Sequence, residues 1–173
     1  MKLTPLTRKF VLHWGEMGTR WGINRTVAQV HALLFISPKP LQAEEIVATL
    51  SVARSNVSTS LKELQNWGLV KVVHVLGDRR DHFETHKDVW ALFQIILQER
   101  KRREVDPTVA LLRAAVADTK SGGKADHYAR EQLAKMLEFF ESATTCYEGV
   151  GKLSPSALRK LVKMGGKAGA LLR

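Results

Sequence analysis

Residues 54–67, with the sequence RSNVSTSLKELQNW, decide the fold of this chain. Their apolar side chains Val57, Leu61 and Leu64 recur at the spacing of one helical face, and Gly68 follows. Glycine adopts the left-handed backbone that commonly ends a helix. The pattern therefore predicts a helix over this stretch, with its apolar face turned toward a core.

A shorter helix is expected just before it. Residues 43–50 place apolar side chains on one side, and two carboxylates stand in the first turn, where they suit the helix dipole. Residues 51–53 interrupt the pattern, so a short turn joins the two helices. Together they predict a helix-turn-helix.

A β-hairpin is predicted next. Residues 69–76 are rich in valine, residues 82–85 alternate between polar and apolar, and Gly77-Asp78-Arg79-Arg80 lies between them. A helix-turn-helix followed at once by a hairpin with a basic tip is the order of a winged-helix module. The wing is expected at about residues 69–86.

The rest of the chain is expected to be helical. Residues 121–123 (SGG) are interpreted as a flexible joint, and residues 165–169 as a frayed tail. The fold class is therefore mainly α with a small β-hairpin. Apolar spacing and capping residues predict the flanking helices at residues 5–21, 25–36, 87–103, 106–118, 129–147 and 155–164.

The charge is unevenly distributed along the chain. Lys and Arg number 27 against 17 Asp and Glu, which gives a net charge of +10 over 173 residues. Residues 1–25 hold five basic and one acidic residue, and residues 150–173 hold six and none. An excess of this size suggests an anionic partner, although a solvated basic tail also explains much of the total.

Several classes of protein are excluded by the sequence. No stretch approaches the roughly 20 apolar residues that a membrane span needs, and residues 1–10 lack the pattern of a secretion signal, so we expect a cytoplasmic protein without membrane contact. No catalytic motif is present, so we expect a non-enzyme without cofactor or metal. The single cysteine, Cys146, is interpreted as a small buried hydrophobic residue, with a redox sensor as the alternative.

The outer face of the helix at residues 54–67 carries short polar side chains. A merely soluble helix would normally carry Glu, Lys and Gln there, because Ser, Thr and Asn are weaker helix formers. Short side chains let a helix backbone approach base edges in the major groove, where Asn pairs with adenine and Arg with guanine. The alternative is a capping segment without a role. The predicted DNA-binding residues of this helix are Arg54, Ser55, Asn56, Ser58, Thr59 and Lys62.

The hairpin tip adds two arginines. Arg79 and Arg80 are placed to enter the minor groove or to bind phosphate, and Asp78 is placed to orient one of them. The alternative is a turn with two solvated arginines.

Five stretches of the chain together form a recognisable pattern: residues 14–18 (WGEMG), 20–25 (RWGINR), 54–58 (RSNVS), 64–70 (LQNWGLV) and 77–83 (GDRRDHF). They resemble the GbsR-like branch of the MarR-type transcriptional regulators. The resemblance implies a winged-helix homodimer that binds a palindromic operator, usually as a repressor, with the terminal helices at the dimer interface. Some members of this branch respond to choline or related osmoprotectants.

Two positions depart from the usual helix-turn-helix pattern. Ser51 stands where glycine is common in the turn, and Ala53 stands where Ser or Thr usually caps the second helix. Losing the cap is expected to cost about 0.5 to 2 kcal/mol of local stability.

Two further sites are considered. The aromatic residues Trp14, Trp21, Trp90 and Phe93 are candidates for an effector pocket, because aromatic faces hold quaternary ammonium ions; the alternative is that they are core or interface residues. His82, Glu84 and His86 alternate along the second strand, but the favoured interpretation is a polar outer face of the wing and no metal.

The sequence therefore predicts a dimeric, sequence-specific DNA-binding transcriptional regulator, with double-stranded DNA and a second copy as partners and a small molecule as a possible effector. The apolar stripe from Ala129 to Tyr147 is too long for one small module to bury, which supports the homodimer. Residues 1–103 form the DNA-binding domain, and residues 104–173 form the helical dimerisation region with a basic tail. The alternatives are a winged-helix protein-interaction module and a non-specific DNA-binding protein.

Overall fold

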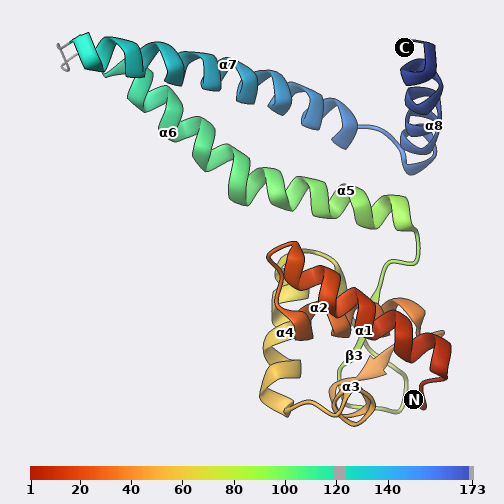
Figure 1. Ribbon diagram of the computed structural model, residues 1–173. Helices are drawn as coiled ribbons and strands as arrows, with labels where there is room; N and C mark the ends of the chain where they lie inside the picture. Colours follow the sequence, from red (N-terminus) through yellow and green to blue (C-terminus); the bar gives the residue numbers. More distant parts are fainter. Residues whose placement is uncertain (119–123, 172–173) are drawn as a thin grey trace. The chain divides into compact units, whose positions relative to one another are not determined.

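Helix α2 (Arg25–Ile36) is the centre of the first unit of a computed structural model that describes residues 1–118 and 124–171 (Figure 1). Asn24 begins the helix, because its Oδ1 accepts a hydrogen bond from the Thr26 amide at 2.8 Å. Val30 and Leu33 are fully buried. The predicted central helix is confirmed.

Helix α1 (Pro5–Arg20) packs directly on α2 through two glycines. A Cβ atom on Gly18 would overlap that of Ala28, and one on Gly15 would lie 2.6 Å from Cγ of Gln29. The helices are close because these positions lack side chains. The face of α1 that meets the core therefore carries Val11, Gly15 and Gly18. The aromatic residues Trp14 and Trp21 lie beside this face.

Helices α3 (Ala43–Leu50) and α4 (Arg54–Asn66) form the predicted helix-turn-helix. The Glu45 carboxylate accepts a hydrogen bond from the backbone amide of Gln42 at 3.0 Å, which fixes the start of α3. Ser51 ends α3 in the left-handed region at φ 54°, and Ala53 supplies no side-chain cap to α4. Both departures noted in the sequence therefore have a structural counterpart.

The wing is a small antiparallel sheet with three strands, β1 (Leu41–Gln42), β2 (Val70–Val73) and β3 (His82–Thr85), in the order β1-β3-β2. Leu41 and Val72 both lie opposite Phe83, on its two sides. The predicted hairpin is confirmed, but β2 ends at Val73 and a loop of residues 74–81 follows. Strand β1 was not predicted, because two residues carry no periodicity.

A lysine closes the C-terminal end of α2. The Nζ atom of Lys87 donates to the carbonyl oxygens of Leu34, Phe35 and Ser37 at 2.6, 2.9 and 2.7 Å. These carbonyls have no partner within the helix, so the ammonium group satisfies them and meets the negative end of the helix dipole.

The second unit begins with a helix that is continuous where a break was predicted. Helix α5 (Val89–Arg100) passes through a π-helical turn, η1 (Lys101–Val105), into α6 (Asp106–Ala117). Proline lacks an N–H and clashes with the carbonyl four residues earlier. The wider turn, in which the Asp106 amide donates to the Lys101 carbonyl, admits Pro107 without ending the helix. The predicted helix from Asp106 is confirmed as α6, but the break expected before it was wrong, because η1 joins α5 to α6.

Helix α7 (Lys124–Gly151) pairs with α6, and α8 (Pro155–Leu171) follows. Arg113 of α6 contacts Glu141 of α7 at 2.8 Å, and the predicted stripe residues Leu133 and Leu137 are half-buried. The predicted joint at residues 121–123 lies outside the described residues. The expected frayed tail was wrong for the backbone of residues 165–169, which continues the amphipathic α8.

The two units divide between Leu92 and Phe93, whereas the sequence placed the domain boundary after residue 103. The division falls in α5 because the continuous α5-η1-α6 helix carries residues 93–103 into the second unit. None of the helices described is both long and apolar enough to cross a membrane.

Candidate nucleic-acid interface

Helix α4 turns a polar face to solvent. Val57, Leu61 and Leu64 are at most 3% exposed and anchor the helix in the core. Ser60 of the same helix is polar but also buried, because it lies next to Val57 and Leu61 on the inner side. All six residues predicted to read DNA are exposed: Arg54, Ser55, Asn56, Ser58, Thr59 and Lys62.

Arg54 at the start of this face pairs with a carboxylate of the preceding helix. Its guanidinium lies 3.1 Å from Glu44 of α3, and both side chains are more than half exposed. Exposed pairs of this kind are weak, so a phosphate can compete for the arginine. Lys62 forms no ion pair within residues 1–118 and 124–171 and presents an uncompensated charge.

The wing tip holds one arginine in a fixed orientation. Nε of Arg80 donates to Oδ1 of Asp78 at 2.8 Å, Nη2 donates to Oδ2 at 2.7 Å, and the Arg80 amide donates to Oδ1 at 3.0 Å. These bonds hold the pKa of the Asp78 carboxyl well below its usual range and raise the pKa of Arg80. The predicted orienting role of Asp78 is confirmed, while Arg79 is exposed and forms no ion pair in the described part of the chain.

Two residues that the sequence did not single out for this tip complete its hydrogen bonding. The amide nitrogen of Gln42 in β1 lies 2.9 Å from Oδ2 of Asp78 and 3.0 Å from Nε2 of His82. Nδ1 of His82 lies 3.0 Å from the Arg80 carbonyl oxygen. Gln42 is separated from Asp78 by 36 positions in the sequence and from His82 by 40, so no local pattern predicts these contacts.

His82 therefore does not lie on a solvated outer face, as the alternation along the strand had suggested. It is 8% exposed, and Glu84 instead pairs with Lys71 at 3.0 Å. The twist of the short sheet and the pairing of β3 on both edges bury His82 beside Gln42. Within the described residues, no group of three or more His, Cys, Asp or Glu side chains is arranged to hold a metal ion.

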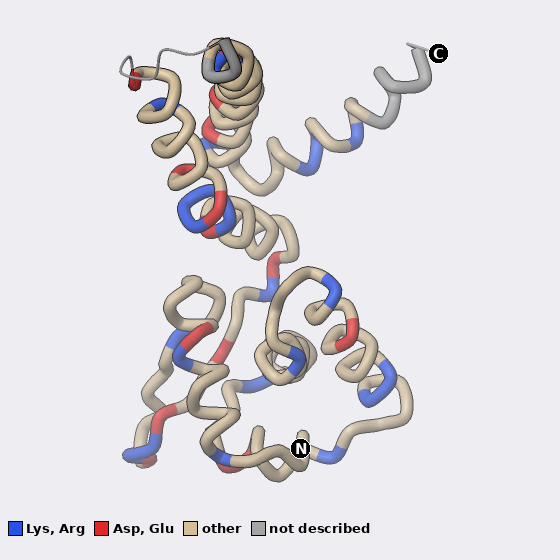
Figure 2. The backbone as a smooth tube through the Cα atoms, turned by 60° about the vertical axis from the view of Figure 1, so that its left-hand side comes forward, with Lys and Arg blue, Asp and Glu red and all other residues tan. Residues whose placement is uncertain are grey.

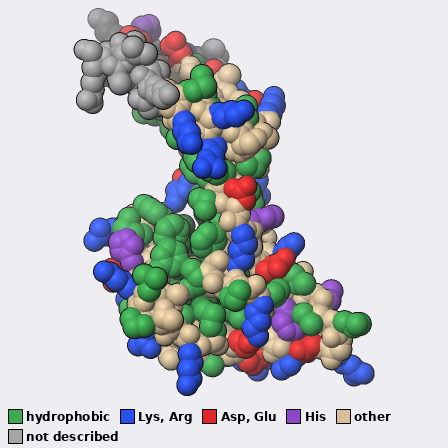
Figure 3. All heavy atoms as spheres, turned by 90° about the vertical axis from the view of Figure 1, so that its right-hand side faces the viewer, with side chains coloured by type: hydrophobic (Ala, Val, Ile, Leu, Met, Phe, Trp, Pro, Cys, Tyr) green, Lys and Arg blue, Asp and Glu red, His purple; other side chains and the backbone are tan. Residues whose placement is uncertain are grey.

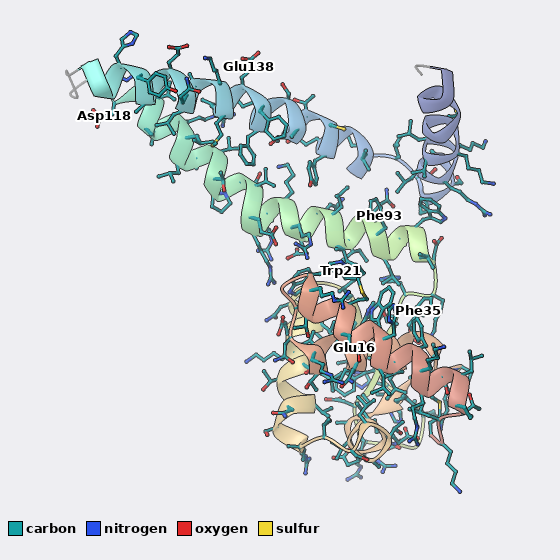
Figure 4. All side chains as sticks on the ribbon, in the orientation of Figure 1. Glu16, Trp21, Phe35, Phe93, Asp118 and Glu138 are labelled. Atoms are coloured by element: carbon teal, nitrogen blue, oxygen red, sulfur yellow. The ribbon has the colours of Figure 1, made fainter. Side chains whose placement is uncertain are left out.

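The predicted aromatic set is brought together only in part. The rings of Trp14 and Trp21 meet edge to face with centroids 5.8 Å apart, and Phe10 stacks on Trp14 at 5.5 Å. Trp21 is 48% exposed at the end of α1 (Figure 4), and Figure 3 shows hydrophobic side chains gathered over one face of the first unit. Trp90 is half-buried at the start of α5, whereas Phe93 belongs to the second unit.

Cys146 is exposed on α7, so the interpretation of this residue as a buried hydrophobic side chain was wrong. At 100° per residue it shares a face with Tyr128 and Phe139, on the side of α7 opposite Leu137.

The fold and this face define the class of the protein: a winged-helix domain that carries a helical extension. Residues 21–81 match the MarR family. This segment holds α2, both helices of the helix-turn-helix and the wing tip, which confirms the resemblance to MarR-type regulators.

Two individual proteins are similar over most of the chain. The HTH-type transcriptional repressor GbsR of Bacillus subtilis (strain 168) is 23% identical over 139 residues, which cover 79% of this chain and 77% of the repressor. A solved structure described as the crystal structure of a transcriptional regulator has a TM-score of 0.57 and 21% identity, and covers 84% of this chain and 99% of that one. The second likeness shows that the fold extends beyond the winged helix.

Proposed function

We propose that this protein is a sequence-specific DNA-binding transcriptional regulator that represses as a dimer at a palindromic operator. The observation that carries the proposal is the exposed polar face of α4 beside the Asp78–Arg80 wing tip. Short side chains at the N-terminal end of a recognition helix contact base edges in the major groove, and a wing arginine contacts the flanking minor groove or phosphate. The similarity to the GbsR repressor supports the direction of the regulation.

Exposed apolar side chains of the second unit support the dimer. Leu133 and Leu137 lie on the same side of α7 as Glu141, which pairs with Arg113 of α6, so the surface left for a second copy is the rest of α7 with parts of α6 and α8. A two-fold dimer on a palindromic operator presents its two recognition helices about one DNA turn, ~34 Å, apart. The exposed side chains are Leu111, Tyr128, Met136, Phe139, Leu161, Val162 and Met164.

A small cationic or apolar effector is the third part of the proposal. The perpendicular pair of Trp14 and Trp21 offers one ring face and one ring edge, and Trp21 is open to solvent. Ring faces attract quaternary ammonium ions. Titration of choline and betaine, followed by Trp21 fluorescence and by operator affinity, tests this part, with Trp21→Leu as the variant that abolishes the response.

The function is tested by selection of bound fragments from a genomic DNA library. Recovery of a short inverted repeat is expected, and binding to it should weaken steeply with salt because phosphate contacts release counterions. Asn56→Ala should weaken operator binding by roughly 1 to 3 kcal/mol with little change on unrelated DNA. Asn66→Ala, nearly three turns along the same helix, is the matched control. Absence of any enriched sequence would favour a protein-interaction module or a general DNA binder.

A further inference from the structure

The base of the wing is joined to the helix-turn-helix by side-chain hydrogen bonds that converge on Asp78. The carboxylate accepts three bonds from Arg80 and a fourth from Nε2 of Gln42 at 2.9 Å. Gln42 is also the N-cap residue of α3, and its backbone N–H donates a hydrogen bond to the Glu45 carboxylate. One side chain thus connects the start of the helix-turn-helix to the wing tip.

His82 fixes the orientation of the side-chain amide of Gln42. Its Nδ1 faces the Arg80 carbonyl oxygen, which is only an acceptor, so Nδ1 carries a proton. Nε2 of the neutral ring is then an acceptor, and the Gln42 amide nitrogen donates to it at 3.0 Å and to Asp78 at the same time. Both protons of the Gln42 amide are used.

We infer that Gln42 and His82 are positioning residues for DNA binding, which act by holding Asp78 and thereby pre-setting the Arg80 guanidinium at the wing tip. The inference rests on the proposed function. Arg80 is the residue placed to reach DNA, because its side chain is 65% exposed, whereas Gln42 is half-buried and His82 is 8% exposed. Orienting a long side chain before binding lowers the entropy that binding must otherwise remove.

Charged side chains lie around the contact between Gln42 and His82. Asp78 is the carboxylate that faces the His82 ring, with 3.7 Å between Nε2 and Oδ2. Glu44 and Glu45 of α3 act electrostatically on Arg80. Lys71 and Glu84 pair with each other on the neighbouring strand positions.

The test uses Gln42→Met and His82→Asn in the full chain. Methionine keeps the length of Gln42 without its donors, and the Asn amide retains a donor toward the Arg80 carbonyl without titrating. His74→Asn, an exposed histidine in the same wing loop, is the control. The probe is the inverted-repeat duplex recovered by selection, with a scrambled duplex of equal length for non-specific binding.

Gln42→Met should lower the ratio of specific to non-specific affinity roughly five- to twentyfold, in line with loss of a hydrogen bond to a charged group. In the Arg80→Ala background the same substitution should have almost no effect, because the two residues act through one contact. An equal loss in both backgrounds would overturn the inference, since it would show a merely structural role. His82→Asn should lower the same ratio, because it removes the acceptor of the Gln42 side chain, whereas His74→Asn should leave the ratio unchanged.

A measurement without DNA separates the inference from the proposed function. In NMR spectra of the free wild-type protein, the Nε–H group of Arg80 should show restricted motion. In both variants the same group should become mobile. If it stays ordered in them, the positioning role is wrong even where operator binding is intact. If the wild type binds no specific duplex yet the resonance responds as expected, the wing arrangement holds and the proposed function fails.

Discussion

The two units of the chain differ in how completely each buries its own apolar residues. In the first, Val30, Leu33 and Leu41 are fully buried, and α1, α3, α4 and β3 pack against α2. In the second, the paired helices α6 and α7 leave Phe139 at 68% and Leu111 at 69% exposed. A helix pair has two sides, and one side alone is covered by the partner helix. The difference indicates that the core of the first unit is closed within one chain, whereas α6 and α7 of the second unit leave an apolar surface uncovered.

The same comparison applies to the basic residues. All four cations of the run Arg100–Arg103 contact carboxylates of the second unit: Glu99, Glu104, Asp106 and Glu148. By contrast Lys62 and Arg79 of the first unit are left without such contacts in the part described, and Figure 2 shows Lys and Arg but no Asp or Glu along the drawn part of α8. A dense basic run in sequence is therefore a poor guide to which cations are available to bind DNA.

The largest expected effect comes from charging the exposed face of the second unit. Met136→Glu combined with Phe139→Glu should give monomers with operator affinity at least about 100-fold lower, because unpaired carboxylates are costly to bury. Sedimentation and duplex titration measure both quantities. Glu138→Gln, on the side of α7 that points away from α6 (Figure 4), should leave the dimer intact. A double variant that remains dimeric would place the interface elsewhere.

Acid should act next most strongly, and on the first unit. Burial and then Lys87 lower the pKa of His31 to about 4, and its Nε2 has no hydrogen-bond partner among the described residues. The unfolded chain binds a proton below pH 6.5 that the folded chain does not, so the free energy of unfolding falls by about 3 kcal/mol from pH 6.5 to 4.

Urea unfolding at several pH values measures this loss. His31→Leu should flatten the dependence between pH 6.5 and 4.5, and the exposed His86→Gln should leave it unchanged. An unaltered slope in His31→Leu would show that other groups carry the acid sensitivity.

Removing the lysine that ends α2 should destabilise the first unit by about 2 kcal/mol, because Lys87→Met leaves three carbonyls without their charged donor. It should also raise the pKa of His31, on which Lys87 acts. Lys71→Met, which removes an exposed pair, should cost less than about 1 kcal/mol. Equal costs for the two variants would contradict the role of Lys87 as a cap.

A smaller and opposite effect is expected at the turn of the helix-turn-helix. Ser51→Gly should stabilise the first unit by up to about 1 kcal/mol, because glycine adopts the left-handed backbone at φ 54° without steric cost. Thermal unfolding measures the gain. Gly68→Ser, at a second left-handed position of φ 70°, should lose a similar amount.

The smallest effect is expected from the neutralised basic run. Arg102→Gln should leave affinity for DNA nearly unchanged, because Arg102 already contacts Glu99 at 2.6 Å. Arg79→Gln should weaken binding to all duplexes and reduce its salt dependence by about one counterion. The contrast fails if the two variants lose affinity to the same extent.

Most of the predicted helices could be found in the sequence because each depends on local spacing. The stripe of Val57, Leu61 and Leu64 needs only a period of 3.6 residues, and Asn24 caps α2 through contacts two residues away. Where a local rule failed, a second local rule competed with it. The rule that proline follows a helix start predicted a break at Asp106, but a π turn accommodates Pro107 at lower cost.

The sequence by itself determined the helix-turn-helix, the wing and the exposed polar face of α4, because hydrophobic periodicity and turn residues act over a few positions. Only the tertiary structure decided which polar groups meet. Lys87 reaches Leu34 across 53 residues, and Gln42 reaches His82 across 40. Such contacts depend on how the sheet and helices pack, and a one-residue change of register in a strand would exchange the side chains on its two faces. The sequence therefore specifies the exposed polar face of α4, which we propose reads DNA, and the packing specifies how Arg80 is held at the wing tip.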